Sequence, residues 1–142
     1  MKTLRIYILG FAVFLTLGLI NVNAQVLHLN DYPWDGDFIV DCPNSDITVL
    51  KGTLIQDFVI HLDKEGNWIK INGQYDKSEY IANTGEVFRV FGALTLVLTE
   101  DFCFNETLLF FGDRGTKIMA KTLVRYKDGV LTKDMLNIDC PK

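Results

Sequence analysis

The chain carries two histidines, His28 and His61, and imidazole is the side chain that most readily binds metal or exchanges a proton near neutral pH. Zinc sites need three or four His, Cys or carboxylate ligands at set spacings, and no such set is visible around either residue. The acidic segment Asp31–Asp37 contains a glycine, as calcium loops do, but lacks their alternate-position spacing and closing glutamate. The sequence therefore predicts no metal site, two surface histidines and a solvated acidic loop.

Nucleophilic catalysis also lacks its usual residue patterns. There is no Gly-x-Ser-x-Gly motif, Ser45 and Ser78 have no histidine nearby in the sequence, and Cys103 has no adjacent base. The glycines of Gly112–Thr116 are not followed by the Lys-Ser/Thr pair of a phosphate loop. We expect no cofactor.

Paired carboxylates are the remaining catalytic arrangement, because two acidic side chains suffice for glycoside hydrolysis. The candidates are Glu79, Glu86, Glu100 and Asp101. The chain has 18 acidic residues, so such pairs also arise by chance. A small extracellular hydrolase or isomerase that uses carboxylates therefore stays an alternative, without assigned catalytic residues.

A possible ligand-binding cluster comes from two neighbouring segments. If 63–67 is a hairpin connection, the polar positions on either side of it share one face, and cross-strand neighbours lie within about 5.5 Å. The residues placed together in this way are His61, Trp68, Lys70 and Asn72. A tryptophan beside polar donors is typical of binding surfaces, although Trp68 could equally be packed by a neighbouring loop.

Period-two alternation of apolar and polar residues dominates the chain after residue 37, which predicts strands rather than helices. Turn sequences recur at intervals of roughly 8–12 residues, as in sandwiches and barrels. We expect one all-β domain of about eight or nine antiparallel strands, as a barrel or a two-sheet sandwich. The expected core residues are Phe58, Ile60, Ile69, Ile71, Phe88, Leu96, Leu98, Phe110, Ile118 and Ile138.

Residues 1–24 have the layout of a secretory signal peptide. A basic start precedes the apolar run 6–20, and small residues occupy Val22 and Ala24 before the predicted cleavage. Fifteen apolar residues are short for a membrane span, which needs about 20. We therefore expect a protein secreted to the periplasm or the extracellular space, with an irregular arm over 25–36, an all-β domain over 37–142 and no transmembrane segment after cleavage.

Cysteine usage fits an oxidising compartment. Cys42 and Cys140 lie near the two ends of the β domain and each precedes a proline, so we predict a disulfide between them. Cys103 lies between two phenylalanines, which favours a buried free thiol. The alternative is that all three cysteines are unpaired. Asn105 begins a glycosylation sequon that matters only in a host that glycosylates secreted proteins.

The net charge of the chain is −4, and it becomes −6 when Lys2 and Arg5 leave with the signal peptide. An acidic chain without basic clusters along its sequence argues against nucleic acid and anionic membrane surfaces as partners. The expected partner is an extracellular small molecule, a glycan or a protein.

Several short segments recur in an order that resembles small secreted all-β bacterial proteins of uncharacterised function. These segments are Cys42, Gly52-Thr53, Gly66-Asn67, Thr84–Phe88, Phe111–Gly115 and Cys140. The resemblance implies a secreted all-β domain and assigns no catalytic or binding residue. Together with the missing catalytic patterns, it favours a non-enzymatic binding or interaction module. A structural envelope or matrix protein is a further alternative, for which an unpaired edge strand or a broad apolar patch would be the sign.

Overall fold

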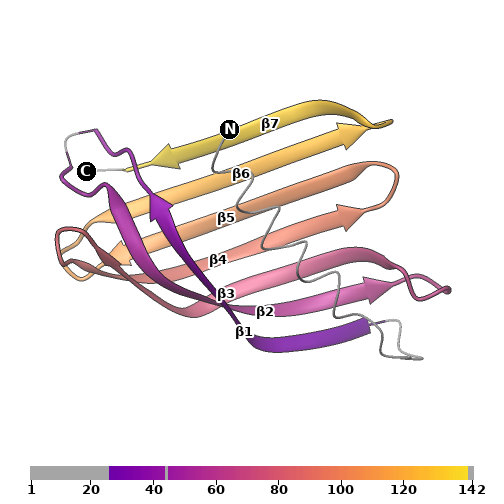
Figure 1. Cartoon of the computed structure of the whole chain (residues 1–142), viewed down its shortest axis with the longest axis horizontal. Helices are drawn as coiled ribbons and strands as arrows, with labels where there is room; N and C mark the ends of the chain where they lie inside the picture. Colours follow the sequence, from indigo (N-terminus) through magenta and orange to yellow (C-terminus); the bar gives the residue numbers. More distant parts are fainter. Residues whose placement is uncertain (1–25, 44, 141–142) are drawn as a thin grey trace.

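The computed structural model describes residues 26–43 and 45–140, which form one sheet of seven antiparallel strands (Figure 1). The strands lie across the sheet in chain order, each paired with the next. Their bounds are β1 (Val26–Ile39), β2 (Val49–Leu62), β3 (Trp68–Ala82), β4 (Val87–Leu98), β5 (Phe102–Gly112), β6 (Lys117–Lys127) and β7 (Val130–Asp139). The described residues contain no helix, so the predicted all-β antiparallel class is confirmed.

The number and closure of the strands differ from the expectation. There are seven strands, because segments counted separately in the sequence are continuous, as in β4. Gly92 does not end the strand. It is the point where the backbones of β4 and β5 approach closely, because a Cβ atom at residue 92 would lie 2.2 Å from the backbone oxygen of Thr107 on β5. β1 and β7 stand at opposite ends of the strand order, so the sheet is open. It is not closed into a barrel, and the described residues form no second sheet.

β1 replaces most of the irregular arm expected over 25–36, whose first residue lies outside the described part of the chain. The expectation rested on the polar and turn-forming residues between Asp31 and Asp37, which are poor strand formers. Pairing with β2 overrides this local preference, because it satisfies the backbone of 12 residue pairs between Val26 and Ile39.

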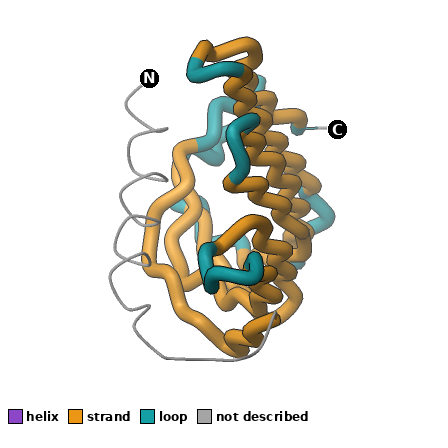
Figure 2. Tube along the Cα trace, turned by 90° about the vertical axis from the view of Figure 1, so that its right-hand side faces the viewer, coloured by secondary structure: helices purple, strands orange, loops and turns teal. Residues whose placement is uncertain are grey.

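The sheet is curved rather than flat, as Figure 2 shows. Its register shifts between Leu29 and Tyr32 in β1, between Thr53 and Asp57 in β2, and between Tyr75 and Ser78 in β3. These shifts lie beside one another across the three strands, and bulges of this kind bend strands and increase their twist. β1 and the start of β2 consequently turn over one face of the sheet, which we call the inner face.

The core lies between this folded-over part and the inner face of β3–β7. Phe38 of β1 packs edge-on against Tyr80 of β3 and Phe110 of β5, with ring centroids 5.2 and 5.4 Å apart. These strands are not neighbours in the sheet, so the contact exists because the sheet bends. Of the ten expected core residues, seven are buried, Leu98 and Ile138 pack against the core, and Ile69 does not belong to it.

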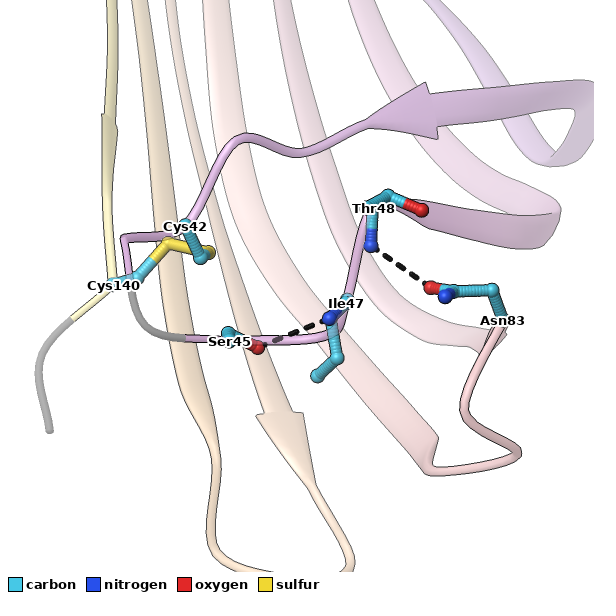
Figure 3. The surroundings of a disulfide bond; sticks show 6 residues. All are labelled: Cys42, Ser45, Ile47, Thr48, Asn83 and Cys140. Carbon is cyan, nitrogen blue, oxygen red and sulfur yellow. Dashed lines mark hydrogen bonds between the residues drawn. A yellow bond between two sulfur atoms is a disulfide. The ribbon is translucent and has the colours of Figure 1, made fainter.

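A disulfide between Cys42 and Cys140 joins the loop after β1 to the end of β7 (Figure 3). Their Cα atoms are 5.6 Å apart across a sequence separation of 98 residues. The same loop is held by Asn83, whose side-chain oxygen accepts the backbone N–H of Thr48 at 2.8 Å. Cys103 is free and half-buried on β5. The bridge is the one that the sequence predicted.

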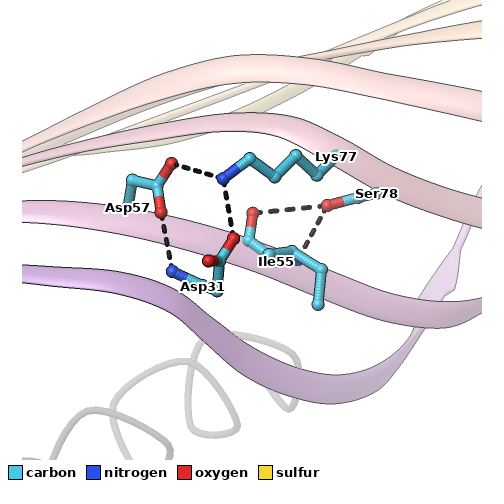
Figure 4. Close-up of polar contacts among 5 residues, drawn as sticks. All are labelled: Asp31, Ile55, Asp57, Lys77 and Ser78. Atoms are coloured by element: carbon cyan, nitrogen blue, oxygen red, sulfur yellow. Dashed lines mark hydrogen bonds and ion pairs between the residues drawn. The ribbon is translucent and has the colours of Figure 1, made fainter.

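An exposed charge cluster lies at the bulges (Figure 4). The ammonium of Lys77 is 2.6 Å from a carboxylate oxygen of Asp31 and 3.3 Å from one of Asp57. The backbone N–H of Asp31, which has a φ of 54°, donates to Asp57 at 2.7 Å. This hydrogen bond, together with Lys77, lowers the pKa of Asp57. Asp31 thus serves the bend of the sheet, where the sequence suggested a solvated loop.

Candidate functional site

Three of the four residues predicted to bind ligand lie together on the outer face, the side of the sheet away from the core. His61 of β2 is the direct cross-strand neighbour of Lys70 on β3. The side-chain amide nitrogen of Asn72 is 3.2 Å from Nε2 of His61, and the hydroxyl of Thr95 donates to the amide oxygen of Asn72 at 3.4 Å. The side-chain amide of Asn72 on β3 thus links His61 of β2 to Thr95 of β4.

Trp68 is separated from these residues. The register shifts at the end of β2, so Trp68 pairs with the buried Leu62, and Ile69 becomes the extra residue before Lys70. Trp68 consequently packs against the core, whereas Ile69 is not part of the core cluster. A bulge of one residue inverts the alternation on which both expectations depended. A binding role for Trp68 stays a prediction, and it would not be shared with the other three.

The outer face continues from His61 and Lys70 across the rest of the sheet. The register places Lys70 beside Val97, then Cys103, then Arg125 and finally Lys133 in one row across five strands. Six cationic side chains and one carboxylate, that of Asp139, lie on the outer face of β4–β7. The six are Arg89, Lys117, Lys121, Arg125, Lys127 and Lys133. All six are exposed.

Apolar and amide or hydroxyl side chains are interleaved with these cations. Phe91 and Phe111 are each 41% exposed and lie edge to face with centroids 5.9 Å apart. On β6, Met119 and Leu123 occupy the outward positions between the cationic residues. The polar side chains on the same face include Gln74, Thr95, Asn105, Thr107 and Asn137.

Sequence reasoning did not assign the cations of β6 and β7 to a site. The signal was present, because Lys117, Lys121 and Arg125 alternate with apolar residues and must share a face of any strand. Whether they form one surface with Lys70 and Lys133 depends on the order and register of the strands. Strand order and register do not follow from the residue pattern within one strand.

The titratable groups of the interior form a separate set. Glu106 is 5% exposed, and a carboxylate oxygen accepts the hydroxyl of Tyr75 at 2.8 Å. Burial raises the pKa of Glu106 to about 7, against the opposing effect of this hydrogen bond. Tyr80 is fully buried, its hydroxyl has no hydrogen-bond partner among the described residues, and burial raises its pKa. Leu94 and Thr122 are the register neighbours of Glu106, so it lies within a packed interior.

The best-formed cleft among the described residues does not reach Glu106. It lies where β1 crosses β5–β7, it is lined mainly by apolar side chains such as Trp34, Phe110 and Ile138, and it holds about 40 Å³. That volume accommodates water molecules, whereas ligand pockets usually hold about 300–1,000 Å³. The cleft therefore has no room for an organic substrate.

Glu86, one of the carboxylates that the sequence offered for catalysis, has a structural position. It is buried, and it accepts the backbone N–H groups of Arg114 and Thr116 at 3.2 and 3.3 Å and the hydroxyl of Thr116 at 2.9 Å. These bonds join the turn before β4 to the turn before β6. Glu79, by contrast, is exposed and lies opposite Arg89. Within residues 26–43 and 45–140, no group of three or more His, Cys, Asp or Glu is arranged to hold a metal ion.

Comparisons with family models, with curated proteins and with solved structures found no match for this chain. In the part of the chain that the structure describes, no helix is long and apolar enough to span a membrane. The predicted signal peptide lies outside the described residues.

Proposed function

We propose that this protein is a secreted, non-enzymatic binding or interaction module and that the outer face of the sheet is its binding surface. The observation that carries the proposal is the gathering of six exposed cations and one carboxylate on the outer face of β4–β7, in a chain whose net charge is −4. No ion pair within 4 Å neutralises any of the six among the described residues. Exposed charges in such an arrangement attract and orient a partner of opposite charge.

The inaccessible interior of the protein favours a binding function at the surface over a hydrolase or isomerase that would use buried carboxylates. Glu106, Tyr75 and Tyr80 are almost inaccessible, and the cleft where β1 crosses β5–β7 is lined by other residues. General acid–base catalysis needs the acid within hydrogen-bonding reach of the substrate. Secretion is supported by the signal-peptide pattern of residues 1–24 and by the Cys42–Cys140 disulfide, because disulfides persist in oxidising compartments.

A paired binding and activity experiment tests this function. The protein, exported from cells that express the full chain, is screened against glycans, lipids and extracellular proteins, and bound ligands are mapped by amide chemical shifts. We expect the largest shifts on the outer face around Lys121 and Arg125. Glu106→Gln should bind equally well, because residue 106 is sealed in the core. Substrate turnover that Glu106→Gln abolishes, or shifts confined to the interior, would contradict the proposal.

A structural envelope or matrix role is the second candidate, and the edge of the sheet favours it. β7 ends the strand order, so one side of its backbone pairs with no described strand. Val130, Leu131 and Leu136 on this strand are 64%, 46% and 50% exposed. Proteins usually protect such edges, because unpaired strands add to one another.

Sedimentation over a range of concentrations tests this second role. If β7 mediates assembly, the protein should form oligomers whose fraction rises with concentration, and Leu136→Lys should reduce that fraction by about tenfold or more, because it places charge in a buried contact. Ile81→Lys is the matched control, since Ile81 is 55% exposed on β3, away from this edge. A monomer at all concentrations would remove the assembly role.

A further inference from the structure

β6 presents a regular series of cations and apolar groups on its outer side. Lys117, Lys121 and Arg125 are each four residues apart, which corresponds to about 13 Å along a strand. Met119 and Leu123 fill the outward positions between them. The whole series is about 26 Å long at 3.3 Å per residue, and it runs along an open sheet face rather than into a pocket.

Neighbouring strands widen this series into a surface of mixed character. Lys133 and Met135 occupy successive outward positions on β7, and Lys133 lies directly opposite Arg125. Hydroxyl and amide groups lie between the cations: Thr107 is opposite Lys121 on one side, and Asn137 is opposite it on the other. The carboxylates that border the surface are Asp139, which is opposite Met119 on β7, and Glu79, which is opposite Arg89 on β3.

This interleaving distinguishes between classes of anionic partner. A protein surface that lies on a membrane segregates its apolar groups from its charged groups, so that one set enters the lipid and the other stays in water. Along β6 each outward apolar side chain lies between two cations, Met119 between Lys117 and Lys121 and Leu123 between Lys121 and Arg125. The apolar row that Met119 forms with Leu109 and Phe91 runs across the strands and is crossed by this charged series. A linear anionic polysaccharide has the matching chemistry: each pyranose ring combines an apolar face, hydroxyls and, in acidic sugars, a carboxylate or a sulfate.

We propose that the outer face of β3–β7 binds a linear anionic polysaccharide along β6. Lys117, Lys121, Arg125 and Lys133 contact its carboxylate or sulfate groups, and charge-assisted hydrogen bonds of this kind are the stronger ones. Thr107 and Asn137 contact the hydroxyls, and Met119 and Leu123 contact the faces of the rings. The inference rests on the proposed function as a binding module and names its ligand class.

The test measures binding of the exported protein to polygalacturonate, with fully methyl-esterified polygalacturonate as the uncharged probe. We expect binding to the charged polymer that weakens as salt rises, because exposed charge pairs are screened. The double variant Lys121→Gln, Arg125→Gln should lose about tenfold or more in affinity. The control variant Lys51→Gln, Lys64→Gln changes the net charge equally at exposed positions on β2 and in the turn before β3, away from this series, and its affinity should change by less than about threefold.

Several outcomes would overturn the inference. Equal weakening of both double variants would mean that net charge alone governs binding. Stronger binding to vesicles of phosphatidylglycerol than to polygalacturonate would identify a lipid surface, and equal affinity for single-stranded DNA would indicate a general polyanion surface. If no polysaccharide binds while another ligand shifts outer-face amides, the polysaccharide is wrong and the binding module stands. If no ligand of any class binds the outer face, both proposals fail.

Discussion

Replacing Cys42 and Cys140 by serine is expected to lower the free energy of unfolding by roughly 4–5 kcal/mol. The bridge closes a loop with a sequence separation of 98 residues, and cross-linking a loop of this length removes much conformational entropy from the unfolded chain. In the folded state the same bond joins the end of β7 to the loop that follows β1. Without it, the folded-over part of the sheet depends on contacts such as that of Phe38 with Phe110.

Urea unfolding of the oxidised protein and of the double-serine variant measures this effect from the shift of the midpoint. Cys103→Ser is the control, because Cys103 is a free thiol on β5 and its loss breaks no covalent bond. We expect the control to change stability by no more than about 1 kcal/mol. A double-serine variant whose stability equals that of the control would show that the bridge contributes little to the fold.

Replacing Glu106 by glutamine is expected to stabilise the protein at pH 8 by roughly 3 kcal/mol. Burial raises the pKa of Glu106 from its ordinary value of 4.5 to about 7. Below pH 4.5 the carboxyl is protonated in both states. Between pH 4.5 and about 7 the unfolded chain releases the proton while the folded chain retains it, so stability falls as the pH rises. Above pH 7 this loss is complete.

Glutamine has no proton to release in this range, and its amide oxygen can still accept the hydroxyl of Tyr75. The difference in unfolding free energy between Glu106→Gln and the wild type should therefore be small at pH 4 and grow up to about pH 7. Urea unfolding at pH 4, 6 and 8 measures it. Glu79→Gln is the control, because Glu79 is exposed and its substitution should leave the wild-type profile unchanged. Parallel profiles for Glu106→Gln and the wild type would show that Glu106 titrates normally in the folded protein.

Much of the strand structure was predictable because it depends on local patterns. The turn at 63–67 was expected, and like the turns at 83–86 and 127–129 it combines Asn or Asp with a Gly. Gly66, Gly85 and Gly129 have positive φ values of 86°, 80° and 75°. Alternation also identified the buried side of most strands, which is why Phe58 and Phe88 were expected in the core. The alternation failed at Ile69, where a single inserted residue changes which side chain faces inward.

The candidate site was predictable in part. His61, Lys70 and Asn72 share a face because a short hairpin joins their strands, and sequence distance is enough to infer that contact. The cations of β6 and β7 join them only through four further strand pairings, and no local signal specifies how far each of those pairs is offset. The chain therefore has no basic cluster along its sequence and yet has one on the outer face of its sheet.

The sequence by itself determined that the chain forms antiparallel strands and where most of its turns lie, because these properties depend on residue type and local alternation. It suggested the Cys42–Cys140 pair beside the alternative of three free thiols, and the structure decided for the pair. The tertiary structure alone decided that the sheet stays open, that β1 joins it instead of forming an arm, and that bulges fold its first strands over the core. It also decided that Glu106 is sealed inside and that the cations gather outside. These outcomes depend on register and long-range packing, which are set by the free energy of the whole sheet rather than of any one segment.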